Sequence, residues 1–244
     1  MIENNIEIIT LVYKSVDYLK LIYEQLKSEN CLVDGWNIGI RIVLNDATDE
    51  IIEEVKKLDI EYTIYNDDKP DDYYLNRVYR CYNYAVENSL YDNVCLVNSD
   101  MVFSKNWMTN LLKNYNNETI VCSRLVESGK MPSGEYGISK NFGKSPLDIK
   151  YNEWEDYVEN QKIDKSENGG LFMPCVFNRD RFIECGMYPE GNIYVSGIGN
   201  FGDKFVESGD SYFFNKLKRN YNMNHITVFD SLVYHIQEGE KDNG

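Results

Sequence analysis

The sequence predicts an α/β fold with a mostly parallel central sheet flanked by helices. Short apolar runs of strand length alternate with longer segments whose apolar residues recur every three or four positions. The apolar runs are nearly continuous, which is typical of parallel strands covered on both faces. The chain has 244 residues, of which 43% are hydrophobic, so it can bury a large core. We expect one domain, 1–244, with an elaborated second half.

The first half of the chain, residues 1–104, alternates strand and helix. Strands are predicted at 6–12, 38–44, 62–65 and 94–97. Helices are predicted from near Asp17 to Leu26, at 50–58 and at 74–88, where the apolar residues fall on one face and Arg77, Arg80 and Asn83 do not. This order predicts a doubly wound sheet with right-handed crossovers. The acidic segment 66–72 is predicted to be a solvated loop.

The second half, residues 105–244, is less regular. It opens with a predicted helix at 107–115 and a strand at 119–123, and a later apolar strand is predicted at 228–234. Between them, segment 127–168 is polar and irregular, with a short helix expected at 154–159. A loop this long is more often functional than idle, as a lid or a substrate rim. Trp154 or Tyr157 can stack on a sugar, but we favour a buried anchor for Trp154. The polar tail 238–244 is expected to be mobile.

Charge and cysteine content exclude several classes of protein. The net charge of −15 and the pI near 4.6 leave no basic face for a nucleic acid. The six cysteines lack C-x-x-C spacing and mostly lie in apolar runs, which favours reduced thiols. No basic amino-terminal leader and no run of membrane-spanning length occurs, so we expect a cytoplasmic protein without a membrane span.

The polar tripeptide 98–100 directly follows the predicted strand at 94–97. It places Asn98, Ser99 and Asp100 at the carboxyl end of a buried strand, where open α/β sheets bind ligands. Residues two apart on an extended backbone point the same way, and oxygen donors suit a hard divalent cation. The alternative is that Ser99 or Asp100 caps a following helix. The tripeptide alone does not decide between these two interpretations.

Four motifs in residues 6–104 together resemble the nucleotide-binding half of a GT-A glycosyltransferase, and most closely the inverting family 2. Segment 12–14 resembles the family's Thr-Tyr-Asn turn after the first strand, and 42–49 resembles its strand ending in Asp-Asp-Gly-Ser-x-Asp. Segment 80–83 resembles its Ala-Arg-Asn helix, and 98–100 resembles its metal-binding Asp-x-Asp. Asn45 and Asn98 stand where the family usually has acids, and Ala47 replaces a glycine.

The resemblance implies a role for each matched position. The donor, a nucleoside-diphosphate sugar with UDP-sugars favoured, is expected to bind at Tyr13, Asn45, Asp46, Arg80, Asn98 and Ser99. Mn²⁺ or Mg²⁺ is expected at Asp100 and at His235, because His235 ends the last strand as a histidine near the metal does in many relatives. Imidazole is a better ligand for Mn²⁺ than for Mg²⁺. His225 is expected to lie in a loop and to be incidental.

The acceptor half also resembles the family. Segments 169–180 and 185–189 resemble its glycine-led strand, Arg-x-x-Phe helix and Gly-Gly-Phe-Asp turn, and 207–217 resembles its Glu-Asp-x-Asp-Leu helix. On this match Asp210 is the general base and Gly209 replaces the adjoining acid. Glu207 is the alternative base, one turn away on a helix. A structural interpretation is that Asp210 only caps the helix.

The predicted function is therefore metal-dependent transfer of a sugar to the hydroxyl of a glycan, protein or small-molecule acceptor, with inversion in one displacement. Two alternatives remain. A non-catalytic binding domain is compatible with the replacements at Asn45, Asn98 and Gly209. A sugar-nucleotidyltransferase is less favoured, because segment 12–16 lacks the glycines that admit a triphosphate. Retention instead of inversion, the sugar, the base and the acceptor stay open.

Overall fold

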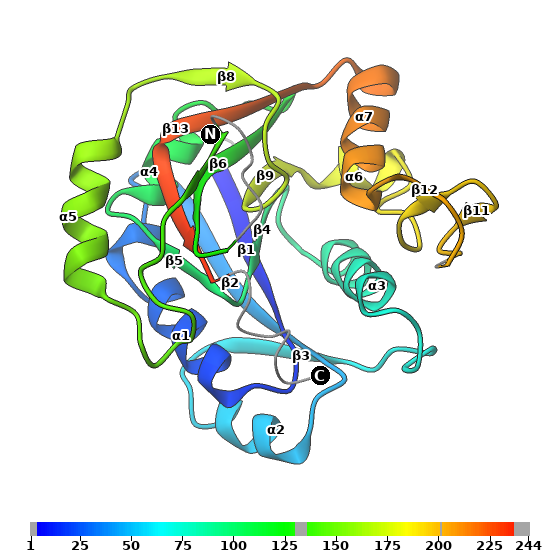
Figure 1. Ribbon diagram of the computed structural model, residues 1–244, viewed down its shortest axis with the longest axis horizontal. Helices are drawn as coiled ribbons and strands as arrows, with labels where there is room; N and C mark the ends of the chain where they lie inside the picture. Colours follow the sequence, from blue (N-terminus) through cyan, green and yellow to red (C-terminus); the bar gives the residue numbers. More distant parts are fainter. Residues whose placement is uncertain (1–3, 130–135, 201, 237–244) are drawn as a thin grey trace.

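The computed structural model describes residues 4–129, 136–200 and 202–236. Figure 1 shows strands and helices alternating through the first half, as predicted. They are β1 (Asn4–Val12), α1 (Val16–Leu26), the 3-10 helix η1 (Glu29–Cys31), β2 (Trp36–Asn45), α2 (Asp49–Val55), β3 (Glu61–Tyr65), α3 (Tyr74–Glu87), β4 (Asn93–Asn98) and β5 (Met101–Phe103).

The second half adds short strands and helices around two long strands. Its elements are α4 (Trp107–Leu112), β6 (Thr119–Glu127), β7 (Gly137–Ser139), α5 (Tyr151–Gln161), β8 (Ser166–Asn168), β9 (Cys175–Asn178), α6 (Arg179–Glu184), β10 (Ile193–Tyr194), β11 (Gly197–Ile198), β12 (Phe205–Glu207), α7 (Gly209–Tyr221) and β13 (Asn224–His235). The segment 127–168 therefore contains regular structure at β7, α5 and β8.

The main sheet has the strand order β3-β2-β1-β4-β9-β6-β13-β5, with β7 beside β6 and β8 beside β13. Its first four strands are parallel, and so are β6 and β13, whereas β9 runs antiparallel between β4 and β6. This agrees with the predicted mostly parallel sheet. A small separate sheet, in the order β11-β10-β12, lies beyond α3 and α7.

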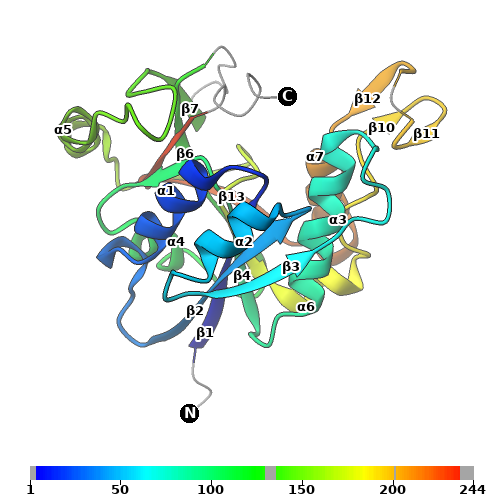
Figure 2. The same cartoon turned by 90° about the horizontal axis from the view of Figure 1, so that it is seen from below.

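Helices cover both faces of the main sheet, which explains the nearly continuous apolar runs of its strands (Figure 2). On β1, Ile8 and Val12 pack into the cluster beneath α1, α2 and α4, whereas Ile9 and Leu11 pack into the cluster beneath α3, α6 and α7. Each fully buried aliphatic side chain stabilises the fold by about 1.5–3 kcal/mol. Because the first four strands run parallel, their carboxyl ends lie at one edge of the sheet.

Several elements differ from the predictions in their extent. Strand β6 continues to Glu127, and the predicted short helix is the longer α5. Strand β13 already begins at Asn224, because it pairs with β6 and β8 before a bulge between Val228 and Leu232. His225 therefore lies in a strand, and the prediction of a loop position is wrong. Helix α1 is capped by Ser15, and Asp17 lies in its first turn.

Buried groups confirm two predictions and contradict a third. All six cysteines are free and buried, and Trp154 is 1% exposed, as expected of an anchor. It packs near Phe142 and Tyr234. The charges of segment 66–72 are not all solvated, however, since Asp67 is buried against Arg80. None of the helices in the described part of the chain is long and apolar enough to cross a bilayer.

Candidate functional site

Most of the predicted donor residues lie at one edge of the sheet. Leu11 in β1 pairs with both Val43 in β2 and Asn98 in β4, so the chain leaves all three strands at nearly the same level. Tyr13 follows β1, and Asp46 follows β2 in the left-handed conformation, with φ of 49°. This arrangement is the one expected of ligand-binding residues in an open parallel sheet.

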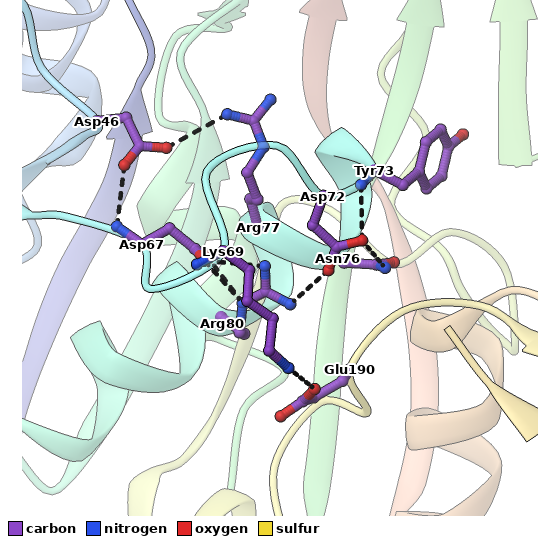
Figure 3. Close-up of polar contacts among 9 residues, drawn as sticks. All are labelled: Asp46, Asp67, Lys69, Asp72, Tyr73, Asn76, Arg77, Arg80 and Glu190. Atoms are coloured by element: carbon purple, nitrogen blue, oxygen red, sulfur yellow. Dashed lines mark hydrogen bonds and ion pairs between the residues drawn. The ribbon is translucent and has the colours of Figure 1, made fainter. Parts of the chain in front are cut away.

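Asp46 and Tyr13 are joined by an arginine that we did not predict as a site residue. Arg77 Nη1 lies 3.3 Å from Asp46 Oδ2 and 3.2 Å from the Tyr13 hydroxyl, and its guanidinium lies 4.9 Å from the centre of the Tyr13 ring. Figure 3 shows Arg77 reaching from α3 toward Asp46. The available sequence signal was that Arg77 and Arg80 share the helix face turned away from the apolar core.

Arg80 has different partners. Its guanidinium binds both oxygens of Asp67, with a shortest distance of 2.9 Å, and Nη1 lies 2.9 Å from Asp72 Oδ2 (Figure 3). Asp67 also donates its backbone N–H to Asp46 Oδ1, at 2.9 Å. Arg80 therefore ties the segment between β3 and α3 to the helix, while Arg77 is the arginine in contact with Asp46.

Two asparagines occupy positions where the resembling family has acids. Asn45 is 3% exposed, and among the described residues its Oδ1 has no hydrogen-bond partner. Asn98 Oδ1 accepts a hydrogen bond from the Tyr82 hydroxyl at 3.0 Å. Ser99 is buried beside it at the end of β4. An unpartnered buried oxygen such as that of Asn45 is costly unless a ligand donates to it.

Asp100 and His235 are brought together by the pairing of β5 with β13. His235 pairs with Met101, and the N–H of Ile236 donates to the Asp100 carbonyl at 2.9 Å. His235 Nε2 lies 3.2 Å from Asp100 Oδ2. The element after Asp100 is strand β5, so the alternative that Ser99 or Asp100 caps a following helix is wrong.

The same histidine contacts a third residue that we did not predict. His235 Nδ1 lies 3.5 Å from an oxygen of Glu127, which is 5% exposed. Burial alone would lower the pKa of His235, but the carboxylates of Asp100 and Glu127 raise this pKa to about 10. The ring therefore carries a proton that a metal ion would have to displace on binding.

The donor atoms at this point fit a divalent cation. Two neighbouring ligands of one octahedral Mg²⁺ or Mn²⁺ ion lie about 3 Å apart, because each bond is about 2.1 Å long. The separation of 3.2 Å between Asp100 and His235 meets this requirement. Within the described residues, no group of three or more His, Cys, Asp or Glu side chains is arranged to hold a metal, so an ion here would need phosphate oxygens or water as its other ligands.

Asp210 lies apart from these residues, in the first turn of α7. The N-cap of the helix is Ser208, whose hydroxyl accepts from Ser211, so the interpretation of Asp210 as the cap is wrong. Burial raises the pKa of Asp210, against hydrogen bonds from Ser208 and from the Ser211 N–H that favour its ionised form. Its own N–H donates to the Tyr79 hydroxyl at 3.0 Å. A partly buried carboxylate whose ionised form is disfavoured by burial is suited to accept a proton.

The neighbours of Asp210 explain why position 209 is a glycine where the resembling family has an acid. A Cβ on Gly209 would lie 2.4 Å from the Tyr79 ring and 2.6 Å from the Gly191 carbonyl oxygen. Tyr79 is held there by stacking on Tyr188, with ring centres 5.0 Å apart. Glu207, the alternative base, lies 3.4 Å from both Ser211 Oγ and Asn215 Nδ2. The acid usually present at position 209 therefore has no room in this arrangement.

Comparison with known proteins identifies the fold. No family model matches the sequence. No curated protein matches it either. Among solved structures, S. aureus TarS 1–349 aligns with a TM-score of 0.56 at 11% identity, over 95% of this chain and 60% of that one. The mannosyltransferase PcManGT of Pyrobaculum calidifontis, in complex with GDP-Man and Mn²⁺, aligns at 0.53 and 15% identity, over 95% and 56%.

A third structure is GalNAc-T7 with UDP, GalNAc and Mn²⁺, which aligns with a TM-score of 0.59 at 8% identity, over 96% of this chain and 44% of that one. The chain thus spans less than two thirds of each of these structures. At these identities the likeness concerns the fold. The fold expected from the sequence is confirmed, since the protein has the GT-A fold of these glycosyltransferases.

Proposed function

We propose that the protein is a glycosyltransferase that moves a sugar from a nucleoside-diphosphate sugar to an acceptor hydroxyl. The observation that carries this proposal is the pairing of Asp100 with His235 just beyond the end of β4, at the sheet edge where Asp46 also lies. Structures of the same fold that hold GDP-Man with Mn²⁺, or UDP and GalNAc with Mn²⁺, support it. The family 2 assignment, the single domain 1–244 and a cytoplasmic location belong to the same proposal.

The donor nucleoside is assigned to Tyr13, Asn45 and Asp46, with UDP favoured. Asp46 and Arg77 offer an acceptor and a donor of hydrogen bonds side by side, 3.3 Å apart. The unpartnered oxygen of Asn45 supplies a further acceptor. Arg80 lies on the same helix face as Arg77 but is paired with both Asp67 and Asp72, so we assign it to the donor site as the residue that holds the segment between β3 and α3 in place.

Asp100 and His235 would hold a divalent cation between them, with the donor's phosphate oxygens as further ligands. Such an ion acts as a Lewis acid, stabilising the charge that develops on the departing nucleoside diphosphate. The imidazole favours Mn²⁺ over Mg²⁺, which prefers oxygen. Asn98 and Ser99 precede Asp100 directly, and they contribute oxygen atoms near the same phosphates.

Asp210 is assigned as the general base. Its carboxylate would take the proton from the acceptor hydroxyl while that oxygen attacks the anomeric carbon from the face opposite the leaving group. One displacement of this kind inverts the configuration. The raised pKa of Asp210 supports the role, because a base is more effective as its pKa approaches the working pH. The acceptor, a glycan, protein or small molecule, is assigned to the half of the chain at 105–244.

A non-catalytic binding domain is the second candidate, supported by Asn45, Asn98 and Gly209 in place of acids. A sugar-nucleotidyltransferase is less favoured, because the turn after β1 has Lys14 in the left-handed conformation and Ser15 as a helix cap, with no glycine. Turnover separates these candidates. A transferase releases nucleoside diphosphate from the donor when acceptor is present, whereas a binding domain only retains the donor.

The first experiment is a thermal-shift screen of the full chain against UDP-, GDP- and dTDP-sugars, each with Mn²⁺, Mg²⁺ or EDTA. A ligand that binds only the folded state raises Tm, by an amount set by its concentration relative to Kd. We expect a rise with one nucleotide that needs the metal. Absence of any rise in folded protein would contradict the proposed donor site.

A further inference from the structure

Glu127 is a buried carboxylate that the proposed reaction does not use. It ends β6 and lies directly opposite His235 in the parallel pairing of β6 with β13. The backbone fixes this register on both sides, because the Ser128 N–H donates to the His235 carbonyl at 3.2 Å and the Lys140 N–H donates to the Glu127 carbonyl at 3.0 Å. With 5% of its surface exposed, the Glu127 side chain has little freedom to turn elsewhere.

The two nitrogens of the His235 ring face different carboxylates. Nδ1 lies 3.5 Å from Glu127 Oε1, and Nε2 lies 3.2 Å from Asp100 Oδ2. The ring nitrogens point away from each other, so an ion bound at Nε2 lies on the side of the ring opposite Glu127. Glu127 is therefore not placed to share that ion. It is placed to accept the Nδ1–H and thereby to leave Nε2 as the nitrogen with a free lone pair.

We propose that Glu127 is a positioning residue for the metal site, which holds the His235 ring with Nε2 toward Asp100. This inference rests on the proposed function, because it assumes that Asp100 and His235 bind the cation. A histidine ligand whose second nitrogen donates to a carboxylate is fixed in tautomer and orientation, and it is a more basic ligand. Removing Glu127 would thus weaken metal binding without removing a ligand.

The test measures Mn²⁺ binding to the full chain in the presence of UDP. Glu127→Met keeps the approximate length of the side chain and removes the acceptor, and we expect it to raise the Mn²⁺ Kd by about 10- to 100-fold. Glu127→Gln keeps an oxygen that can accept the Nδ1–H, so we expect a rise of about three- to tenfold. Thermal unfolding of each variant without metal shows that it is folded.

The matched control is Glu7→Gln. Glu7 is also a buried carboxylate of the main sheet, 4% exposed, but it pairs with Arg41 at 2.9 Å. We expect this variant to lower Tm and to leave the Mn²⁺ Kd unchanged. Electron spin echo envelope modulation of bound Mn²⁺ detects nitrogen atoms that coordinate the ion, and this signal does not depend on the stability of the protein. Nitrogen modulation from the imidazole is expected in the wild type, weaker at the same Mn²⁺ concentration in Glu127→Met, and absent in His235→Ala.

The possible failures are distinguishable. If wild-type protein with UDP binds no Mn²⁺, or binds it without nitrogen modulation, the metal site of the proposed function is wrong, and this inference falls with it. If the wild type shows the modulation and Glu127→Met keeps both the modulation and the Kd, only the inference is wrong. If Glu127→Met does not fold, an unchanged Kd in Glu127→Gln overturns the inference equally.

Discussion

Asp100 is a buried aspartate and Asp210 a partly buried one, and their surroundings are opposite. The carboxylate of Asp100 lies 3.2 Å from a histidine ring that carries a proton in this arrangement. Asp210 has tyrosines and a helix N-terminus around it, and burial raises its pKa. A charge with a partner is held as a charge, whereas a charge without one is pushed toward its neutral form. The first environment suits a metal ligand and the second a proton acceptor.

The largest expected effect is that of removing the Asp210 carboxylate. Asp210→Asn should lower kcat by about 10²- to 10⁴-fold, because a general base contributes a factor of this size. The donor Kd should stay unchanged, since Asp210 does not touch the donor site. Steady-state kinetics and a donor titration measure the two quantities.

The control for this variant is Glu207→Gln, which should cost far less activity. If Glu207→Gln abolished turnover and Asp210→Asn did not, the assignment of the base would be reversed. Stability gives an independent check. A carboxyl group with a raised pKa gives a contribution to stability that is full below its ordinary pKa and is lost as pH rises through the raised value. Asp210→Asn should therefore be more stable than wild type to urea at pH 7.

Asp67 is another aspartate with a cationic partner, and it lies away from the proposed metal site. Its carboxylate has no exposed surface and binds Arg80 at 2.9 Å. Asp67→Asn should lower the free energy of unfolding by about 3 kcal/mol. This value is at the lower end of the cost of breaking a buried ion pair, because Asp72 still contacts Arg80 in the variant. Urea unfolding measures this loss. The exposed neighbour gives the control, since Asp68→Asn should change the free energy by less than about 0.5 kcal/mol.

Asp100→Asn tests the aspartate that is paired with His235 at the proposed metal site. We expect the Mn²⁺ Kd, measured in the presence of UDP, to rise by about 100-fold. Loss of a residue that only supports a ligand raises a metal Kd by about 10- to 100-fold, and here the ligand itself loses its charge. The control is Asp92→Asn at the opposite end of β4, where the carboxylate accepts a hydrogen bond from Asn5. Equal effects of the two substitutions would show that Asp100 is not a ligand.

His225 extends the comparison to an imidazole whose charged form is disfavoured by burial. Burial lowers its pKa to about 4, and its Nε2 lies 2.9 Å from the Leu171 carbonyl. Because the unfolded state takes up the proton near pH 6.5, stability is complete above this pH and is lost as pH falls toward 4. The loss at pH 5 should be about 2 kcal/mol at most, since the ring is partly exposed.

This loss is measured as a difference. His225→Gln cannot titrate, and all other groups are common to both proteins, so the gap between wild type and variant isolates His225. We expect wild type to lose more stability than His225→Gln between pH 7.5 and pH 5 in urea unfolding. A gap independent of pH would mean that His225 has the same pKa in the folded and unfolded states, which would contradict a pKa lowered by burial.

The sequence predicted what depends on local pattern. The apolar runs of β1, β2 and β4 and the apolar face of α3 follow from periodicity, and the polar strand ends follow from position. Glu127 meets His235 only because β6 and β13 pair in one register, 108 residues apart in the chain. Asp67 meets Arg80 across a loop and a helix, and His225 became a strand residue through pairing with Ile120 of β6. Such contacts depend on tertiary pairing, which periodicity does not encode.

The stacked tyrosines beside Gly209 constrain how this site could have changed over time. Any side chain at position 209 would meet the Tyr79 ring and the Gly191 carbonyl, so an acid cannot enter while both stay in place. A lineage that gains the acid must first accept a smaller residue at position 79 and a shift of the loop at 191. The two positions are thus expected to change in a fixed order, and sequences with an acid at 209 should lack a large ring at 79.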